Sequence, residues 1–348
     1  MVSIFGTKRI DHEHKVTRPA GCATAGPFAV LLVLALSPQS VAAADGEYHL
    51  KLGEISVATS VLGRTAQKFA DLVVEKSGGR ISVSVFPSSQ LGDETQLLQT
   101  ALSPSFRDIN ILSSTILTTI DPQFGLPNLP FIFKNGAAVA AFSGSTAFAN
   151  QRDMLLKSRG MHMLAAWDFP PGNIYVNRPI HSLPDLKGLK LRVPPSADFV
   201  KMFQQLGANP TPIPITQTYI SLQTGVVEGT NGSDDAALAY KYTEVTKYDI
   251  NLHYQVVIDY PILSKRFFQS LPKDLQDVLL SAAQEASAWD HQQIESEAAA
   301  MKSKMEQAGM TVLDVNDIDA WKQAVRPLYD AYIARYGDAD IRLIEELR

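Results

Sequence analysis

The sequence feature that most constrains the fold is a regular alternation of short apolar segments and amphipathic segments in residues 48–112. Two segments have the period-2 pattern of strands and a third is a short apolar strand, and the segments between them are expected to be helices, the first with apolar residues at helical spacing. The strands are expected at 48–57, 80–86 and 108–112, and the helices at about 61–77 and 93–102. A β-α-β-α-β order of this kind predicts an α/β fold whose parallel strands carry helices on both faces of the sheet.

A second α/β unit is expected after Pro170-Pro171-Gly172, which we interpret as a crossing between two domains. A chain of 348 residues is long enough for two domains of ordinary size. A strand at 256–264 is expected to return to the first domain, and a very long helix at about 270–308 to span both. These patterns place residues 45–168 plus about 257–296 in domain I, and residues 169–256 plus about 297–348 in domain II.

The first 44 residues have the pattern of a secretion signal. Four basic residues precede an uncharged apolar run at 27–36, and Ala42-Ala43-Ala44 provides a small-residue cleavage site before Asp45. The run of about ten residues is too short to cross a bilayer as a helix. The sequence therefore predicts a signal peptide at 1–44 and an exported mature protein.

Charge and cysteine content exclude several classes of function. The first 44 residues hold four of the 31 basic and two of the 36 acidic residues, which leaves 27 and 34, a formal net charge of −7. A net acidic chain without a basic cluster argues against nucleic acid as a partner. The only cysteine, Cys22, lies within the predicted signal, so disulfides, thiol catalysis and cysteine metal sites are not expected after it.

Arg192 is the strongest candidate for a binding residue. It lies at the end of a predicted strand, 189–193, just before Pro194-Pro195, where a strand must stop. Ligands of α/β proteins bind beyond the carboxyl ends of strands, and the guanidinium fork can hold a carboxylate with two parallel hydrogen bonds. The alternative for an arbitrary arginine is a surface ion pair.

Four further candidates come from their expected place near a cleft, and each has a structural alternative. Trp167 and Asp168 follow a predicted strand, and Trp167 could instead be core. Asp234 could bind a ligand hydroxyl or amine, or cap the helix that follows it. Glu54 could do the same, or lie at a solvated edge.

No pattern in the sequence indicates an enzyme. The histidines beyond the predicted signal are scattered, and no pair has the spacing of metal ligands on a helix. The sequence also lacks a Gly-x-Ser-x-Gly elbow and a phosphate-binding glycine loop. We therefore expect no catalytic residues, no metal site and no cofactor.

Several short motifs occur in an order that resembles one family over the whole chain after the signal. They are 77–81 (Ser-Gly-Gly-Arg-Ile), 86–87 (Phe-Pro), 90–92 (Gln-Leu-Gly), 129–131 (Leu-Pro-Phe), 185–194, 222–229 and 244–248. The chain resembles the periplasmic solute-binding proteins of tripartite ATP-independent periplasmic (TRAP) transporters, the DctP-like family. This resemblance implies a two-domain binding-protein fold with a hinge, a ligand cleft and a long helix across both domains.

The resemblance also implies a function and a set of site residues. It implies capture of an organic acid in the periplasm by cleft closure and delivery to TRAP permease subunits in the membrane. Arg192 matches the family's carboxylate-binding arginine. A second arginine found in many members is replaced here by Asn173, and the family's binding asparagine by Gly232, for which the neighbouring Asn231 is the candidate substitute. A receptor that reports to a sensor, or a periplasmic enzyme, is the alternative.

Overall fold

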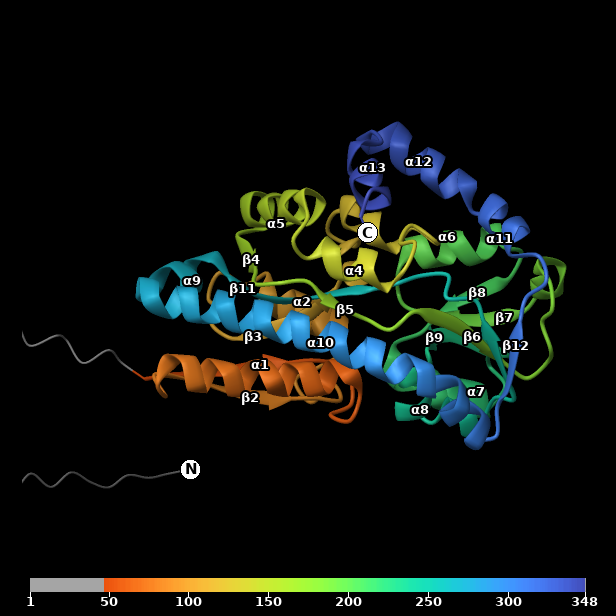
Figure 1. The fold of residues 1–348 in the computed structure, drawn as a ribbon, viewed down its shortest axis with the longest axis horizontal. Helices are drawn as coiled ribbons and strands as arrows, with labels where there is room; N and C mark the ends of the chain where they lie inside the picture. The colour runs from red at the N-terminus through yellow and green to blue at the C-terminus, as the bar shows by residue number, and fades with distance from the viewer. Residues whose placement is uncertain (1–46, 348) are drawn as a thin grey trace, which may run out of the picture. The chain divides into compact units, whose positions relative to one another are not determined.

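The computed structural model describes residues 47–347, so the predicted signal peptide lies outside the described residues. The described chain forms two six-stranded sheets, and each sheet is the centre of one lobe (Figure 1). The first lobe is built on the sheet that contains the N-terminal strands, and the second lobe on the sheet formed mainly by residues 172–251.

The first sheet has the strand order β2-β1-β3-β11-β4, and β5 also pairs with β11. Its strands are β1 (Tyr48–Gly53), β2 (Ile81–Phe86), β3 (Ile109–Ser113), β4 (Met161–Met163), β5 (Trp167–Asp168) and β11 (Ile258–Ser264). β1 runs parallel to both β2 and β3, which confirms the parallel arrangement expected for the first three strands. β11 returns from far along the chain and pairs antiparallel with β3, β4 and β5.

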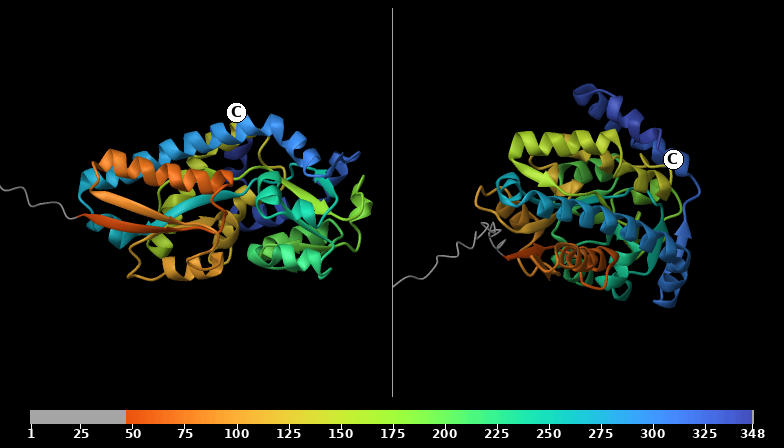
Figure 2. Two further views of the ribbon diagram at one scale, coloured as in Figure 1. Left: turned by 90° about the horizontal axis from the view of Figure 1, so that it is seen from below. Right: turned by 60° about the vertical axis from the view of Figure 1, so that its left-hand side comes forward.

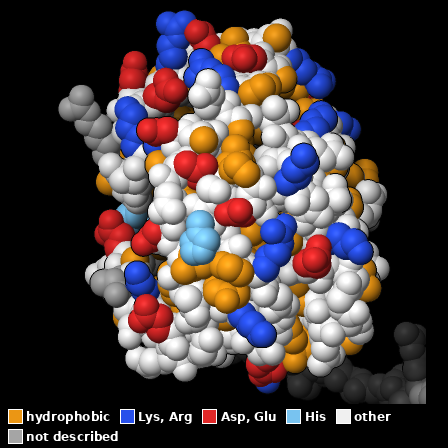
Figure 3. All heavy atoms as spheres, turned by 90° about the vertical axis from the view of Figure 1, so that its right-hand side faces the viewer, with side chains coloured by type: hydrophobic (Ala, Val, Ile, Leu, Met, Phe, Trp, Pro, Cys, Tyr) orange, Lys and Arg blue, Asp and Glu red, His pale blue; other side chains and the backbone are white. Residues whose placement is uncertain are grey.

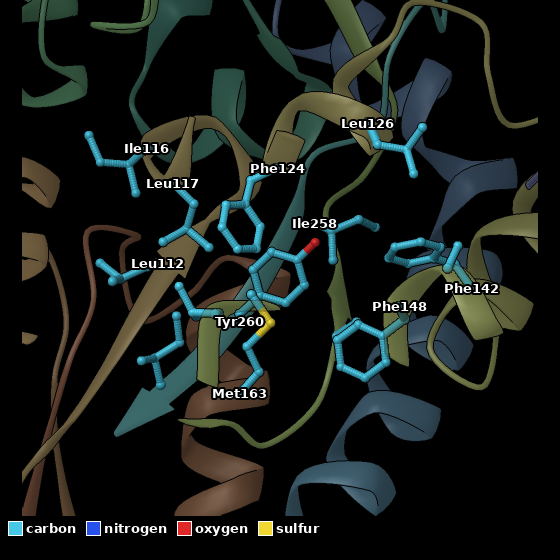
Figure 4. Packing of buried hydrophobic residues seen from close by; sticks show 14 of the residues in the cluster. Leu112, Ile116, Leu117, Phe124, Leu126, Phe142, Phe148, Met163, Ile258 and Tyr260 are labelled. Atoms are coloured by element: carbon cyan, nitrogen blue, oxygen red, sulfur yellow. The ribbon is translucent and has the colours of Figure 1, made fainter. Parts of the chain in front are cut away.

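Helices cover both faces of the first sheet. They are α1 (Val61–Ser77), α2 (Glu94–Ala101), α3 (Ser114–Leu117), α4 (Gly136–Phe142), α5 (Thr146–Arg159) and α9 (Lys265–Ser270). The pattern at 137–159 predicts one helix, but Ser145 caps α5 by accepting a hydrogen bond from the N–H of Phe148, so the segment forms two. Figure 4 shows the core under α4 and α5, where Phe148 stacks on Tyr260 at a ring-centroid distance of 6.1 Å.

The second sheet has the order β12-β10-β6-β9-β7-β8. Its strands are β6 (Gly172–Val176), β7 (Lys190–Val193), β8 (Asn209–Pro212), β9 (Gly229–Ser233), β10 (Tyr248–Asn251) and β12 (Thr311–Asp314). The helices of this part are α6 (Ala197–Gln205), α7 (Thr218–Gln223), α8 (Asp234–Ala239) and α11 (Ile318–Ala324). Gly229 has no room for a side chain, because a Cβ atom there would lie 2.7 Å from the carbonyl oxygen of Tyr175 on β6.

The predicted very long helix is α10 (Lys273–Gln307), and it belongs to both lobes. It packs along α1 and β5 of the first lobe and reaches α8 and β12 of the second (Figures 1 and 2). Two extended crossings also join the lobes, and they hydrogen-bond to each other. The N–H of Phe169 donates to the carbonyl of Val257 at 3.0 Å, and the N–H of Gly172 to that of Gln255 at 2.7 Å. This pair of crossings is placed as a hinge would be.

The chain ends on helices α12 (Arg326–Tyr336) and α13 (Ala339–Glu345). The sequence-based domain boundaries assign residues 297–348 to domain II, whereas Tyr332, Ile341 and Ile344 lie in a core cluster of the first lobe. The reason is that α13 packs on α5, so the chain crosses back once more before it ends.

Acidic and basic side chains are interspersed on the face shown in Figure 3. Among residues 47–347, no helix is both long enough and apolar enough to cross a bilayer.

Candidate functional site

A cavity with about 1090 Å³ of empty space, including its open mouth, lies between the two lobes. The first lobe, the crossings and the second lobe all contribute to its wall. Its lining includes Ser56, Glu94, Thr115 and Asp259 from the first lobe, Phe169 and Tyr254 from the crossings, and Arg192 and Asn231 from the second. A concave lining of mainly apolar side chains with a few polar groups is typical of a site for a small organic molecule.

Arg192 lies at this cavity near the carboxyl end of β7, with only 4% of its surface exposed. Its Nε atom donates a hydrogen bond of 2.8 Å to the carbonyl oxygen of Ile213, which fixes the plane of the guanidinium group. Its two Nη atoms make no hydrogen bond and no ion pair with any residue in 47–347. Burial lowers the pKa of Arg192, but an arginine keeps its charge in a protein. The site therefore offers a fixed cationic fork without a partner.

Other buried polar atoms without a partner gather at the same cavity. They are Ser89 Oγ, Thr115 Oγ1, Asn231 Oδ1, Tyr242 Oη and Asp259 Oδ2. The Nδ2 atom of Asn231 is engaged, because it donates to the hydroxyl of Tyr254 at 3.1 Å. A buried polar atom without a hydrogen bond costs free energy, so this concentration indicates a surface that a ligand completes.

The first-lobe wall of the cavity carries carboxyl groups. Asp93 Oδ1 accepts from the N–H of Gln96 at 2.9 Å and caps α2, and Glu94 Oε1 accepts from the N–H of Ser113 at 2.8 Å. Asp259 is 5% exposed, and its Oδ2 atom has no partner. Burial raises the pKa of both Glu94 and Asp259.

Glu54 lies beside this wall rather than in it. It directly follows β1 and precedes Ile55 and Ser56, which line the cavity, but it is not itself a lining residue. Only 1% of its surface is exposed, and neither carboxyl oxygen has a hydrogen-bond partner within the described chain. Burial raises the pKa of Glu54 to about 8.

Asn173 and Asp234 bind each other and do not line the cavity. Asn173 Nδ2 donates to Asp234 Oδ1 at 2.9 Å, and its Oδ1 accepts from the N–H groups of Leu252 and His253 at 3.0 Å each. Asp234 Oδ1 also accepts from the hydroxyl of Tyr175 at 2.7 Å. The hydrogen-bonding atoms of Asn173 are thus used to hold β6, α8 and the chain after β10 together.

Trp167 and Asp168 also lie away from the cavity, under α10. The indole N–H of Trp167 donates to the carbonyl of Ala283 at 3.1 Å, and the side chain is fully buried. Asp168 Oδ2 lies 2.9 Å from Nδ1 of His291 on α10. Both side chains therefore attach the long helix to the first lobe.

Sequence reasoning did not identify Glu94 and Asp259 as site residues, although each had a signal. Asp259 interrupts an otherwise apolar buried strand, and Glu94 begins the helix that follows the Gln-Leu-Gly motif. A charged residue inside a buried strand is uncommon unless it has a partner.

Among the described residues, no group of three or more histidines and carboxylates is placed to hold a metal ion. A cavity between two lobes, lined by a buried arginine whose Nη atoms make no hydrogen bond within residues 47–347, is typical of a two-lobed binding protein. The chain belongs to the bacterial extracellular solute-binding proteins, family 7 (DctP), whose family model matches residues 52–335.

Named relatives agree with this assignment. The sialic acid-binding periplasmic protein SiaP of Vibrio cholerae is 27% identical over 307 residues, which cover 88% of this chain and 95% of the relative. The C4-dicarboxylate-binding periplasmic protein DctP of Rhodobacter capsulatus is 27% identical over 327 residues, covering 91% and 95%. The resemblance to TRAP solute-binding proteins is therefore confirmed.

Solved structures confirm the fold class. A TRAP periplasmic solute-binding protein of Xanthobacter autotrophicus, with bound β-D-galacturonate, has a TM-score of 0.81 at 27% identity and covers 86% of this chain and 100% of its own. A TRAP periplasmic solute-binding protein of Sulfurospirillum deleyianum with bound succinate has a TM-score of 0.80 at 25% identity, covering 87% and 100%.

Proposed function

We propose that this protein is a periplasmic receptor that captures an organic acid by closing its two lobes and delivers it to a TRAP permease. Contacts from both lobes favour the closed state to the extent that the ligand makes them better there. Capture and release require no chemistry on the ligand, in keeping with a family made of solute-binding proteins.

The observation that carries this proposal is the unfilled guanidinium fork of Arg192. It lies in the cavity, its plane is fixed by Ile213, and both Nη atoms are available. A carboxylate is the ligand group whose geometry matches the fork.

The ligands of the relatives support a carboxylate. Sialic acid, C4-dicarboxylates, galacturonate and succinate are named for four of them, and all of these molecules carry a carboxylate group. The predicted signal peptide and the periplasmic relatives support export of this chain as well.

A thermal-shift screen of the purified protein against organic acids tests the proposal. A ligand that binds only the folded state raises the melting temperature by mass action, by an amount that grows with its concentration over Kd. We expect at least one carboxylate to raise it strongly. If no carboxylate in a broad panel shifts the transition, the proposed function fails.

Replacing Arg192 tests its role directly. Arg192→Ala is expected to weaken binding of that carboxylate by about 2–5 kcal/mol, at least roughly 30-fold in Kd, because the carboxylate loses its buried partner. Arg192→Lys should recover only part of this, since an ammonium group lacks the fork. Lys190→Ala, an exposed cation on the same strand, is the matched control. Calorimetric binding of Arg192→Ala within twofold of wild type would contradict the assignment.

A further inference from the structure

The part of the cavity wall that comes from the first lobe has a chemistry that Arg192 alone does not explain. The charged residues in the cavity lining are one arginine, from the second lobe, and three carboxylic acids, Asp93, Glu94 and Asp259, from the first. Arg192 forms no ion pair with any of these three within the described chain, although its charge acts on Glu94 and opposes the rise in the pKa of that group. A ligand whose only charge is a carboxylate would therefore satisfy Arg192 and leave the acids of the first lobe without a counter-ion.

The three acids differ in how many of their carboxyl oxygens are already hydrogen-bonded within the protein. Asp93 is used as the cap of α2. Glu94 receives one backbone hydrogen bond, from Ser113, and Asp259 lies in register with the same Ser113 on the neighbouring strand. The buried Oδ2 atom of Asp259 has no partner at all in the described residues. Asp259 Oδ2 is thus the carboxyl oxygen of this wall that is left open to a ligand.

Resting on the proposed function, we propose that the ligand is a carboxylate that also carries a protonated amine, and that Asp259 and Glu94 hold this ammonium group while Arg192 holds the carboxylate. Such a zwitterion places its carboxylate against the second lobe and its ammonium group against the first, and it satisfies Asp259 Oδ2 with an N–H donor. It also needs both lobes at once, which is what makes a ligand favour closure.

Three other occupants of this wall fit less well. A second carboxylate would leave Glu94 and Asp259 without a counter-ion and would keep both acids protonated, whereas an ammonium group stabilises their ionised form. A hydroxyl can donate one hydrogen bond to Asp259, but it has no positive charge to stabilise the ionised forms of Asp259 and Glu94. A metal ion is disfavoured because, among residues 47–347, no cluster of three or more ligating side chains is present.

A comparison of ligands that differ in one chemical group tests whether the ligand carries an amine. The ligands form matched sets. Within a set, every carboxylate has the same carbon skeleton and carries an amine, a hydroxyl, a hydrogen or a second carboxylate at the same carbon. The purified protein is screened against the sets by thermal shift, and the dissociation constants of the binders are measured by calorimetry. The panel covers amine positions from the second to the sixth carbon. We expect an amine-bearing carboxylate to bind at least tenfold more tightly than its hydroxyl analogue.

The outcomes separate this inference from the proposed function. If hydroxy acids or dicarboxylates bind as tightly as the matched amines or more tightly, the inference is overturned and the carboxylate receptor stands. If no carboxylate binds, the proposed function itself is overturned and the inference falls with it.

Variants of Asp259 and Glu94 give a second test of the inference. Asp259→Asn and Glu94→Gln are each expected to weaken binding of the amine at least tenfold, and to change the affinity for its hydroxyl analogue less than threefold. Glu75→Gln, which removes an exposed carboxylate from α1 of the same lobe, is the control and should change neither. Equal losses for the amine and the hydroxyl analogue in both acid variants would overturn the inference, because a general packing defect gives that result.

Discussion

Glu54 shows how a single buried carboxyl group affects the stability of the receptor. Its pKa is about 8 in the folded protein because it is buried, whereas it returns to an ordinary value near 4 when the chain unfolds. Between these two pH values the folded state holds a proton that the unfolded state has released. The contribution of Glu54 to the free energy of unfolding therefore falls as the pH rises towards about 8, by up to about 1.4 kcal/mol per pH unit.

Glu54→Gln should remove this contribution. We expect the variant to lose less stability than wild type between pH 6 and pH 9, measured as the free energy of unfolding in urea without ligand. Glu75→Gln should keep the wild-type slope. Parallel slopes for Glu54→Gln and wild type would show that the carboxyl group of Glu54 is ionised in the folded protein.

The position of Arg192 could be predicted from the sequence, because the strand period and Pro194 together fix the end of β7. The partners of Asn173 and Asp234 could not. These residues are adjacent only because β6 and α8 pack together, and a single sequence does not show whether an amide turns to a ligand or to the chain after β10. Asp259 was missed because its strand was considered only as buried.

At the scale of elements, two hydrogen bonds fasten α8 and its flanking residues to the first lobe. Asp235 Oδ2 accepts from the N–H of Val61 at the start of α1 at 3.1 Å, and the hydroxyl of Tyr240 donates to the carbonyl of Ile55 at 2.7 Å. Asp235 does not line the ligand cavity. Its carboxylate meets the positive end of α1, so this contact stabilises the arrangement in which the lobes touch.

Asp235→Ala should therefore weaken ligand binding without touching the ligand. A loss of about 1 kcal/mol, roughly fivefold in Kd, is expected because the closed state loses one charge-assisted hydrogen bond. Calorimetry with the ligand found in the screen measures it, and Asp319→Ala, an exposed acid in the first turn of α11, is the control. An unchanged Kd would mean that the hydrogen bond between Asp235 and Val61 contributes equally to the open and the closed state.

The elements themselves were largely predictable, since most strands and α10 follow clear periods in the sequence. The break between α4 and α5 was missed because the helical spacing of apolar residues continues across it. The structure ends α4 before this point and begins α5 after the N-cap Ser145. The docking of α13 on α5 depends on tertiary packing that no local pattern records.

At the scale of the whole described chain, the lobes share α10 and should unfold together. Trp167 lies in a core cluster of the first lobe and Trp321 in that of the second. The third tryptophan of the chain is Trp289. We expect a variant that keeps only Trp167 and a variant that keeps only Trp321, with the remaining tryptophans replaced by phenylalanine, to report the same urea midpoint by fluorescence. Midpoints that differ while circular dichroism shows two steps would indicate lobes that unfold independently.

The place of β11 has a consequence for how the chain must be made. This strand is inserted between β3 and β4, so the first sheet is not continuous until residue 264 has been synthesised. A nascent chain that ends earlier exposes the edges of β3 and β4, which are templates for pairing with other chains. The first lobe is therefore expected to complete its folding only after about three quarters of the chain have been synthesised, and until then it depends on protection of these two edges.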